Sequence, residues 1–348
     1  MSTRKISVLS SFIRDRLHRH RALHGSSASS SSVPPLIIGM QGPQGSGKTT
    51  ITSQLMKACS TSTDPLRLAC ISLDDLYLPY AGLTAVARAN PTNKLLSGRG
   101  QPGTHDLPLG HKILGELKAI NDGGGHRIVE LPIFDKSLHD GKGDRSSETV
   151  RVSTPPRLDV LLFEGWCLGF EAFKEEAQLK KMYEETQRRT GAGTSEQKPY
   201  FLSHPLEDLL AINVHLRELS QALYPYLDAF VKLVPSSSSP PPSSSSPSSS
   251  ASPRDLSQVF TWRTQAERAM KASNGGKGMT DEQVVQFVAR YMPGYELWDQ
   301  ESGGGMEEAR HEWRFHEKGA SVQLGLGKDR ELLWLDLGEG RVEERPES

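Results

Sequence analysis

One stretch of the chain has the residue types and spacing that binding a polyphosphate requires. Its pattern is G-x-x-x-x-G-K-[ST], in which glycines let backbone N–H groups approach an anion closely. Lys48 would place positive charge at the β- and γ-phosphates, so it is a candidate catalytic residue, and the Thr49 hydroxyl can ligate magnesium. The residues expected to bind the nucleotide are Gly42, Pro43, Gln44, Gly45, Ser46, Gly47, Lys48, Thr49 and Thr50. The pattern predicts a site for ATP and Mg²⁺.

Acidic residues follow two other apolar runs. Glu164 comes after Val160–Phe163 and is expected to ligate Mg²⁺ together with Thr49, since magnesium usually takes only one or two protein carboxylates. Asp74 and Asp75 end the run that begins at Leu68. A kinase that acts on a hydroxyl needs a carboxylate near the γ-phosphate, which makes Asp74 the candidate base and Asp75 the alternative. The N-K-x-D guanine motif is absent, which excludes a Ras-like GTPase.

These residues require a scaffold that brings strand ends together. The predicted strands are Leu36–Met40, Leu68–Leu73, Ile128–Pro132 near a sheet edge, Val160–Phe163 and Phe230–Val234. Helical patterns cover about 49–59, 111–120, 206–227 and 280–291. Alternating strands and helices, with strands apolar on both faces, predict an α/β fold of the P-loop NTPase type, with a mostly parallel sheet flanked by helices. The runs Val322–Leu326 and Leu332–Leu337 predict a C-terminal β-hairpin.

Composition narrows the range of functions. Among 348 residues, 41 are basic and 42 acidic, giving a net charge of −1, which argues against a nucleic-acid partner. No apolar run approaches 18 residues, so no membrane-spanning helix or membrane partner is expected. The three cysteines are far apart and odd in number, which indicates a reducing compartment such as the cytoplasm, or also the nucleus. The oligomeric state cannot be read from the sequence.

Further motifs stand in a fixed order along the chain. They are Ser72-Leu73-Asp74-Asp75-Leu76-Tyr77-Leu78, Arg99-Gly100-Gln101-Pro102-Gly103-Thr104-His105-Asp106, Asp135-Lys136-Ser137, Phe163-Glu164-Gly165-Trp166 and Trp262-Arg263-Thr264-Gln265-Ala266-Glu267. With the phosphate loop they resemble the D-glycerate 3-kinase family, within the phosphoribulokinase/uridine kinase branch of P-loop kinases, over about residues 36–298. Two departures are Phe134, where that family usually has tyrosine, and a Ser/Pro tract in place of a short connection.

The resemblance implies roles for several residues. Asp74 would be the catalytic base, and Arg263 would lie on a lid segment and act on the transferring phosphate. An ion pair with Glu267 at i+4 is the alternative for Arg263. His105 could bind a carboxylate or only shape its loop. The residues expected to bind the acceptor are Asp75, Arg99, His105, Asp106, Asp135 and Lys136.

The implied activity is transfer of the γ-phosphate of ATP to a hydroxyl of a small metabolite, with D-glycerate first. The alternatives are a nucleoside, pantothenate or sugar acceptor, or a regulatory ATPase without a small-molecule acceptor. No sequence feature distinguishes these alternatives directly, because acceptor pockets are built mainly from loops.

The predicted domain organisation has three parts. Residues 1–24 are expected to form an amphipathic helix, 25–32 a Ser-rich linker, and 33–348 a P-loop kinase domain with a disordered Ser/Pro insertion at 235–253. Six basic residues and only one acid, Asp15, lie in residues 4–21. That helix either docks on the domain or is a mitochondrial transit peptide, which gives a mitochondrial or other organellar location as the alternative to the cytoplasm.

Overall fold

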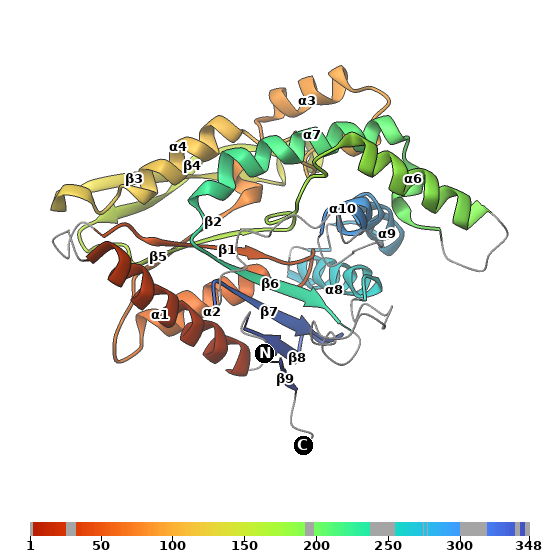
Figure 1. Cartoon of the computed structure of the whole chain (residues 1–348). Helices are drawn as coiled ribbons and strands as arrows, with labels where there is room; N and C mark the ends of the chain where they lie inside the picture. The colour runs from red at the N-terminus through yellow and green to blue at the C-terminus, as the bar shows by residue number, and fades with distance from the viewer. Residues whose placement is uncertain are drawn as a thin grey trace.

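The central element is one seven-stranded sheet. The computed structural model describes residues 3–25, 33–191, 198–236, 255–273, 275–276, 278–299, 319–337 and 342–344. Within them the strand order is β2-β5-β1-β6-β7-β8-β9 (Figure 1). The strands are β1 (Leu36–Gln41), β2 (Leu68–Ser72), β5 (Val160–Gly165), β6 (Ala229–Pro235), β7 (Ser321–Leu326), β8 (Leu332–Asp336) and β9 (Val342–Glu344). The strands from β2 to β7 in this order pair in parallel, whereas β8 pairs antiparallel with both β7 and β9. This arrangement confirms the predicted fold class.

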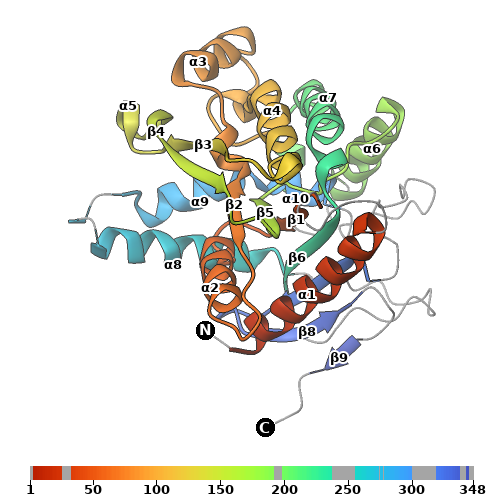
Figure 2. The same ribbon diagram turned by 90° about the vertical axis from the view of Figure 1, so that its left-hand side faces the viewer.

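Helices cover both faces of this sheet (Figure 2). α1 (Thr3–Gly25) and α2 (Lys48–Ser60) pack on one face, where Leu36 and Ile38 of β1 are buried. α4 (Leu107–Lys118) and α7 (Leu206–Leu223) pack on the other face, against Ile37 of β1 and Phe163 of β5. Successive side chains of a strand point to opposite faces, so a continuous apolar run is what a doubly covered strand requires.

The described residues contain eleven further helical segments. They are η1 (Leu73–Leu76), α3 (Tyr80–Ala89), η2 (Lys94–Leu96), η3 (Asp122–Gly124), α5 (Leu138–Gly141), α6 (Glu176–Gly191), η4 (Tyr200–Ser203), η5 (Tyr224–Tyr226), α8 (Ser257–Ser273), α9 (Asp281–Ala289) and α10 (Met292–Leu297). A capping box between Thr280 and Gln283 opens α9, as the sequence predicts. No helix within the described ranges is both long and apolar enough to cross a membrane.

The strand predicted at Ile128–Pro132 is present as part of a longer strand, but it belongs to a different sheet. β3 (Arg127–Asp135) does not join the main sheet; it pairs antiparallel with β4 (Asp144–Thr154), which the sequence pattern did not indicate. The two form a separate ribbon beside α4 (Figure 1). Only one face of the ribbon is buried, through side chains such as Val129, Leu131 and Val152. A strand with one solvated face needs few apolar residues, which explains why β4 is so polar.

The N-terminal helix α1 lies against α2. Leu9, Ile13 and Leu17 of α1 are buried in the same hydrophobic cluster as Leu36 and Ile38 of β1. Arg21 adds an ion pair to Asp159, with 2.7 Å between the guanidinium nitrogen and the carboxylate oxygen. The Ser-rich linker, apart from Gly25, and the Ser/Pro insertion, apart from Pro235 and Ser236, lie outside the described residues, so the predicted domain organisation stays a prediction there.

Candidate active site

The phosphate-binding loop connects β1 to α2. Gly45 and Gly47 have φ values of 75° and 92°, which glycine adopts without strain. The first N–H groups of α2 have no intrahelical partner, so they are available to an anion. The Ser46 hydroxyl is buried without a hydrogen-bond partner among the described residues, and the side chains of Thr49 and Thr50 are exposed on the first turn of α2. This arrangement fits the phosphates of ATP.

Lys48 lies along the loop that precedes it. Its ammonium donates hydrogen bonds to the carbonyls of Gly42 and Pro43, at 2.8 and 3.3 Å. Burial lowers the pKa of Lys48, while the negative charges of Glu164 and Asp74 act in the opposite direction. Lys48 therefore lies within electrostatic reach of both predicted acids, and a bound phosphate would supply the charge that this buried cation lacks.

Glu164 is the charged residue near the carboxyl end of β5, the strand that lies between β1 and β2. Its backbone pairs with Met40 on β1 and with Ser72 on β2. The side chain is buried, and burial raises its pKa, although Lys48 and a hydrogen bond from Ser72 oppose that shift. Among the described residues no cluster of three or more His, Cys, Asp or Glu side chains could hold a metal. A single carboxylate beside the phosphate loop remains compatible with a magnesium site, since magnesium usually takes only one or two protein carboxylates.

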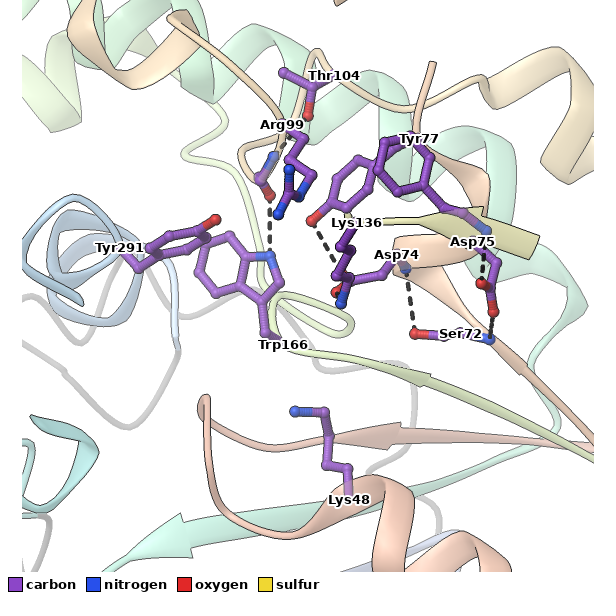
Figure 3. A network of polar contacts seen from close by, with 12 residues as sticks. Lys48, Ser72, Asp74, Asp75, Tyr77, Arg99, Thr104, Lys136, Trp166 and Tyr291 are labelled. Atoms are coloured by element: carbon purple, nitrogen blue, oxygen red, sulfur yellow. Dashed lines mark hydrogen bonds and ion pairs between the residues drawn. The ribbon is translucent and has the colours of Figure 1, made fainter. Parts of the chain in front are cut away.

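Asp74 lies on η1, directly after β2, and both its oxygens are hydrogen-bonded. Oδ1 accepts from the Tyr77 hydroxyl at 2.9 Å, and Oδ2 accepts from the Lys136 ammonium at 2.5 Å. Burial alone would raise the Asp74 pKa, but Lys136, Tyr77 and Lys48 together lower it to about 2. Asp74 is therefore ionised at physiological pH, and Figure 3 shows it on the side of η1 that faces Lys48.

Asp75 has a different environment, although it is the next residue. Its two oxygens accept hydrogen bonds from the backbone N–H groups of Ser72 and Phe134, both at 3.2 Å. The first contact completes a capping box at the start of η1, and the second ties η1 to β3. Burial raises the pKa of Asp75. The carboxylate thus fastens two backbone segments, which favours Asp74 over Asp75 as the base.

Two cations on other segments lie beside Asp74 (Figure 3). Lys136, in the turn after β3, makes the ion pair already described. Arg99 lies 5.9 Å from the centre of the Phe134 ring and donates to the carbonyl of Gly141 at 2.6 Å. Its main partners are neutral carbonyls, so its charge is available to an anionic acceptor.

His105 is buried near Asp74. Its ring stacks on Tyr77 with 4.6 Å between ring centres, and neither ring nitrogen has a hydrogen-bond partner within the described part of the chain. Burial lowers the His105 pKa to about 4, against the opposing charge of Asp74, so the ring is neutral at physiological pH. A neutral ring packed on Tyr77 supports the loop-shaping role more directly than carboxylate binding.

The other two predicted acceptor residues have backbone partners. Asp106 caps α4 by accepting from Leu109 N at 3.1 Å, and its second oxygen pairs with Arg145 at 3.1 Å. Asp135 accepts from the backbone N–H and hydroxyl of Ser137, at 2.8 and 2.6 Å, which lowers its pKa. These contacts organise the loops around Asp74, and they leave acceptor binding by Asp106 and Asp135 a prediction.

Arg263 lies on α8, the predicted lid. It pairs with Glu267 at 2.6 Å, and its guanidinium lies 5.3 Å from the Phe287 ring centre. Glu267 is buried and also accepts from the backbone N–H of Met279. The i+4 ion pair is therefore present in this structure, and a role for Arg263 at the transferring phosphate requires that pair to open.

Sequence reasoning gave no role to three aromatic residues of the site. The Tyr77 hydroxyl donates to Asp74. The spacing of three residues within one helical turn could have indicated this contact from the sequence. Trp166 donates from Nε1 to the carbonyl of Gly100 at 3.0 Å, and its ring packs edge-on against Tyr291, with 4.9 Å between centres. Trp166 and Tyr291 join segments 125 residues apart, which no local pattern reveals.

The fold and the site together define a P-loop kinase that phosphorylates a hydroxyl group. No protein-family model matches the chain. D-glycerate 3-kinase, chloroplastic, of Arabidopsis thaliana is 33% identical over 278 residues, which are 80% of this chain and about half (51%) of the plant protein. The uncharacterized kinase mug58 of Schizosaccharomyces pombe is 31% identical over 75% of this chain and 80% of its own. The solved structure of D-glycerate 3-kinase from Cryptococcus neoformans is 37% identical, with a TM-score of 0.77, and the match covers 96% of this chain and 99% of that one. The chain belongs to the D-glycerate 3-kinase family.

Proposed function

We propose that this protein transfers the γ-phosphate of ATP to a hydroxyl group of D-glycerate. The observation that carries the proposal is the position of ionised Asp74, which faces Lys48 and the phosphate-binding loop and lies beside the cations Lys136 and Arg99. A small hydroxy acid has the matching chemistry, with a hydroxyl for Asp74 and a carboxylate for the cations. The names of the relatives support the same acceptor.

Asp74 would orient the attacking hydroxyl and receive its proton. A carboxylate with a pKa of about 2 is a weak base, which suits a loose transition state in which the proton moves late. The substrate would change this basicity. If its carboxylate engages Lys136, Asp74 loses the cation that holds its pKa down, and it becomes a better proton acceptor in the complex. Binding of the correct acceptor would therefore also activate the base.

The phosphate side would act through charge. Lys48 would neutralise the transferring phosphate, and Arg263 would add a second cation when released from Glu267. Thr49 and Glu164 would hold Mg²⁺, which would offset the negative charge of the phosphates. Lys48 and Thr49 follow β1 and Glu164 ends β5, two strands that are neighbours in the parallel sheet, whereas Arg263 comes from α8.

A metabolite panel with magnesium-ATP tests the proposal by measuring ADP release. D-glycerate is expected to stimulate turnover more strongly than its enantiomer L-glycerate, glycerol, uridine, pantothenate or fructose. If another hydroxyl compound is the better acceptor, the kinase class stands and glycerate is wrong. Equal turnover with and without every compound would identify a regulatory ATPase instead.

A variant of Lys136 tests the carboxylate subsite separately. Lys136→Met removes the charge and keeps most of the side-chain length, so KM for D-glycerate should rise at least tenfold, while turnover with neutral glycerol should not fall. The exposed Lys112→Met on α4 is the matched control, because Lys112 makes only a 4.0 Å surface contact with Glu116. Equal loss with both acceptors would place Lys136 in catalysis and not in carboxylate recognition.

We further propose that the protein acts in the cytoplasm and retains α1. Burial of Leu9, Ile13 and Leu17 supports retention, because cleavage would expose these side chains. Cell fractionation and mass spectrometry of the mature N-terminus test this; a mitochondrial pool that lacks α1 would favour the transit-peptide interpretation.

A further inference from the structure

A single guanidinium joins the C-terminal hairpin to the phosphate-binding loop. Arg330 lies in the turn between β7 and β8, in the left-handed region with φ of 61°. Its Nε donates to the carbonyl of Gly45 at 2.6 Å. Its two terminal nitrogens donate to the Gln265 amide oxygen at 2.7 Å and to the Trp262 carbonyl at 3.1 Å. One side chain therefore contacts both the phosphate loop and α8, which carries Arg263.

The contact with Gly45 bears directly on the geometry of the loop. The Gly45 carbonyl belongs to the peptide whose N–H is that of Ser46, and this N–H donates to the Pro43 carbonyl at 3.2 Å. The peptide is thus held at both ends, on one side by the loop itself and on the other by Arg330. Since Pro43 also accepts from Lys48, a rotation of this peptide would disturb the contacts of the catalytic lysine.

The loop and α8 are also in close contact at this point. A Cβ atom on Gly45 would lie 2.6 Å from the carbonyl carbon of Trp262 and 2.9 Å from the backbone nitrogen of Arg263. Only the absence of a side chain lets the two backbones approach so closely. Arg330 lies over the buried Trp262 ring, with 5.8 Å from the guanidinium carbon to the ring centre.

The hairpin turn that carries Arg330 is itself held in place. The Trp262 indole donates to the Lys328 carbonyl at 2.8 Å. From the N-terminal helix α1, the ammonium of Lys5 donates to the carbonyl of Arg330, and Lys5 is only 2% exposed. Contacts from both ends of the chain therefore meet at this turn. A guanidinium fixed in this way has a planar set of donors that a lysine ammonium cannot reproduce.

We propose that Arg330 is a positioning residue for nucleotide binding, which holds the phosphate loop in register with the lid helix α8. The inference rests on the proposed kinase function of the loop and extends the ATP site to the C-terminal hairpin. Arg330 acts through Gly45 and α8, and it does not touch the reacting atoms. Because its partners lie on the phosphate side, its loss should weaken ATP binding selectively, without a matching effect on the acceptor.

Direct nucleotide binding gives the first test, with the full chain and a non-hydrolysable ATP analogue plus Mg²⁺ in a calorimeter. Arg330→Ala should weaken binding about tenfold to a hundredfold, because charge-assisted hydrogen bonds are among the stronger polar contacts. Arg330→Lys should remain at least fivefold weaker than the wild type, because a point charge restores neither the three-way contact nor the planar geometry. In assays with the best acceptor, KM for ATP should rise while KM for the acceptor changes less than twofold.

Arg14→Ala is the matched control. Arg14 makes three hydrogen bonds, to Ser62 and Asp64, beyond the C-terminal end of α2. Thirteen helical residues separate this point from the phosphate loop, or about 20 Å. Its loss should lower the melting temperature and leave nucleotide affinity unchanged.

The binding assay needs no acceptor, so an error in the glycerate assignment cannot imitate a failure of this inference. Nucleotide affinity within twofold of the wild type in a folded Arg330→Ala protein would overturn the inference, and so would equal weakening in Arg14→Ala. If Arg330→Ala does not fold, nucleotide binding is measured with Arg330→Lys and Gln265→Ala instead. Weaker binding supports the inference, and affinity within twofold of the wild type overturns it.

Discussion

Replacing Asp74 by Asn is the most direct test of the proposed chemistry. The amide keeps the size of the carboxylate, and it can still accept a hydrogen bond from Tyr77. It loses the negative charge that pairs with Lys136 at 2.5 Å and with it the capacity to take up a proton. General-base contributions typically amount to about 10²–10⁴ in rate. At about 1.4 kcal/mol for each factor of ten, the barrier should rise by about 3–6 kcal/mol.

The fold should tolerate this change. Lys136 is half exposed, with 54% of its side chain accessible, so it can be solvated when its partner disappears. Only the Lys136 side of the pair is exposed, so the melting temperature should fall by no more than the lowered Asp74 pKa implies, which is about 2 kcal/mol of stability. Magnesium-ATP affinity should stay within about twofold, because Lys48, Thr49 and Glu164 are untouched.

Phosphoryl transfer to the best acceptor and calorimetric ATP binding, measured on the same preparation, give the result. Asp75→Asn is the matched control, since the same chemical change at the next residue affects only the contacts with Ser72 and Phe134. It should lower stability by about 1–2 kcal/mol and leave most of the activity. The reasoning is refuted if Asp74→Asn retains transfer, or if it loses ATP binding instead, which would make Asp74 a metal-site residue.

Four further outcomes are expected. Lys48→Ala should reduce transfer by about 10³-fold while the protein stays folded, and wild-type turnover in it would mean that ATP binds elsewhere. Glu164→Gln should raise the Mg²⁺ concentration needed for half-maximal rate, in contrast to Asp74→Asn; an unchanged magnesium titration would remove Glu164 from the metal site. Because the folded pKa of Asp74 is about 2, below its ordinary value of 3.8, its contribution to stability is complete above about pH 4 and is lost as the pH falls toward 2. Acid unfolding curves of the wild type and Asp74→Asn should therefore converge in that range. Deleting residues 237–253 with a short Gly-Ser joint should barely change the melting temperature, since loop length enters stability only logarithmically, and collapse of the fold would show that the segment is structural.

Local sequence predicted the phosphate loop well because its function depends on local geometry. The spacing from Gly42 to Thr49 specifies a turn and a helix start, and the structure places both there. The strands of the main sheet could also be predicted from the sequence, since strands buried on both faces form continuous apolar runs. In the separate ribbon β3 was predicted as a strand but β4 was not, because β4 carries residues such as Glu148 and Arg151 that also suit a loop.

The choice between Asp74 and Asp75 shows where sequence reasoning ends. Their positions along the chain are equivalent, and their environments differ because Phe134 N binds Asp75 while Lys136 binds Asp74. Both partners come from a segment about 60 residues later, so the distinction is tertiary. Arg330 is the extreme case, since its contact with Gly45 spans 285 residues and belongs to no motif.

That separation has a consequence for synthesis of the chain. The phosphate loop leaves the ribosome early, whereas Arg330, which holds the Gly45 carbonyl, is made 285 residues later. During most of translation β6 also lacks β7, so its edge is exposed to other strands. The nascent chain would thus carry an unfinished nucleotide site and an open sheet edge until β7 and Arg330 have been made. Chaperone binding to chains stalled before β7 should be stronger than to chains that extend beyond β8.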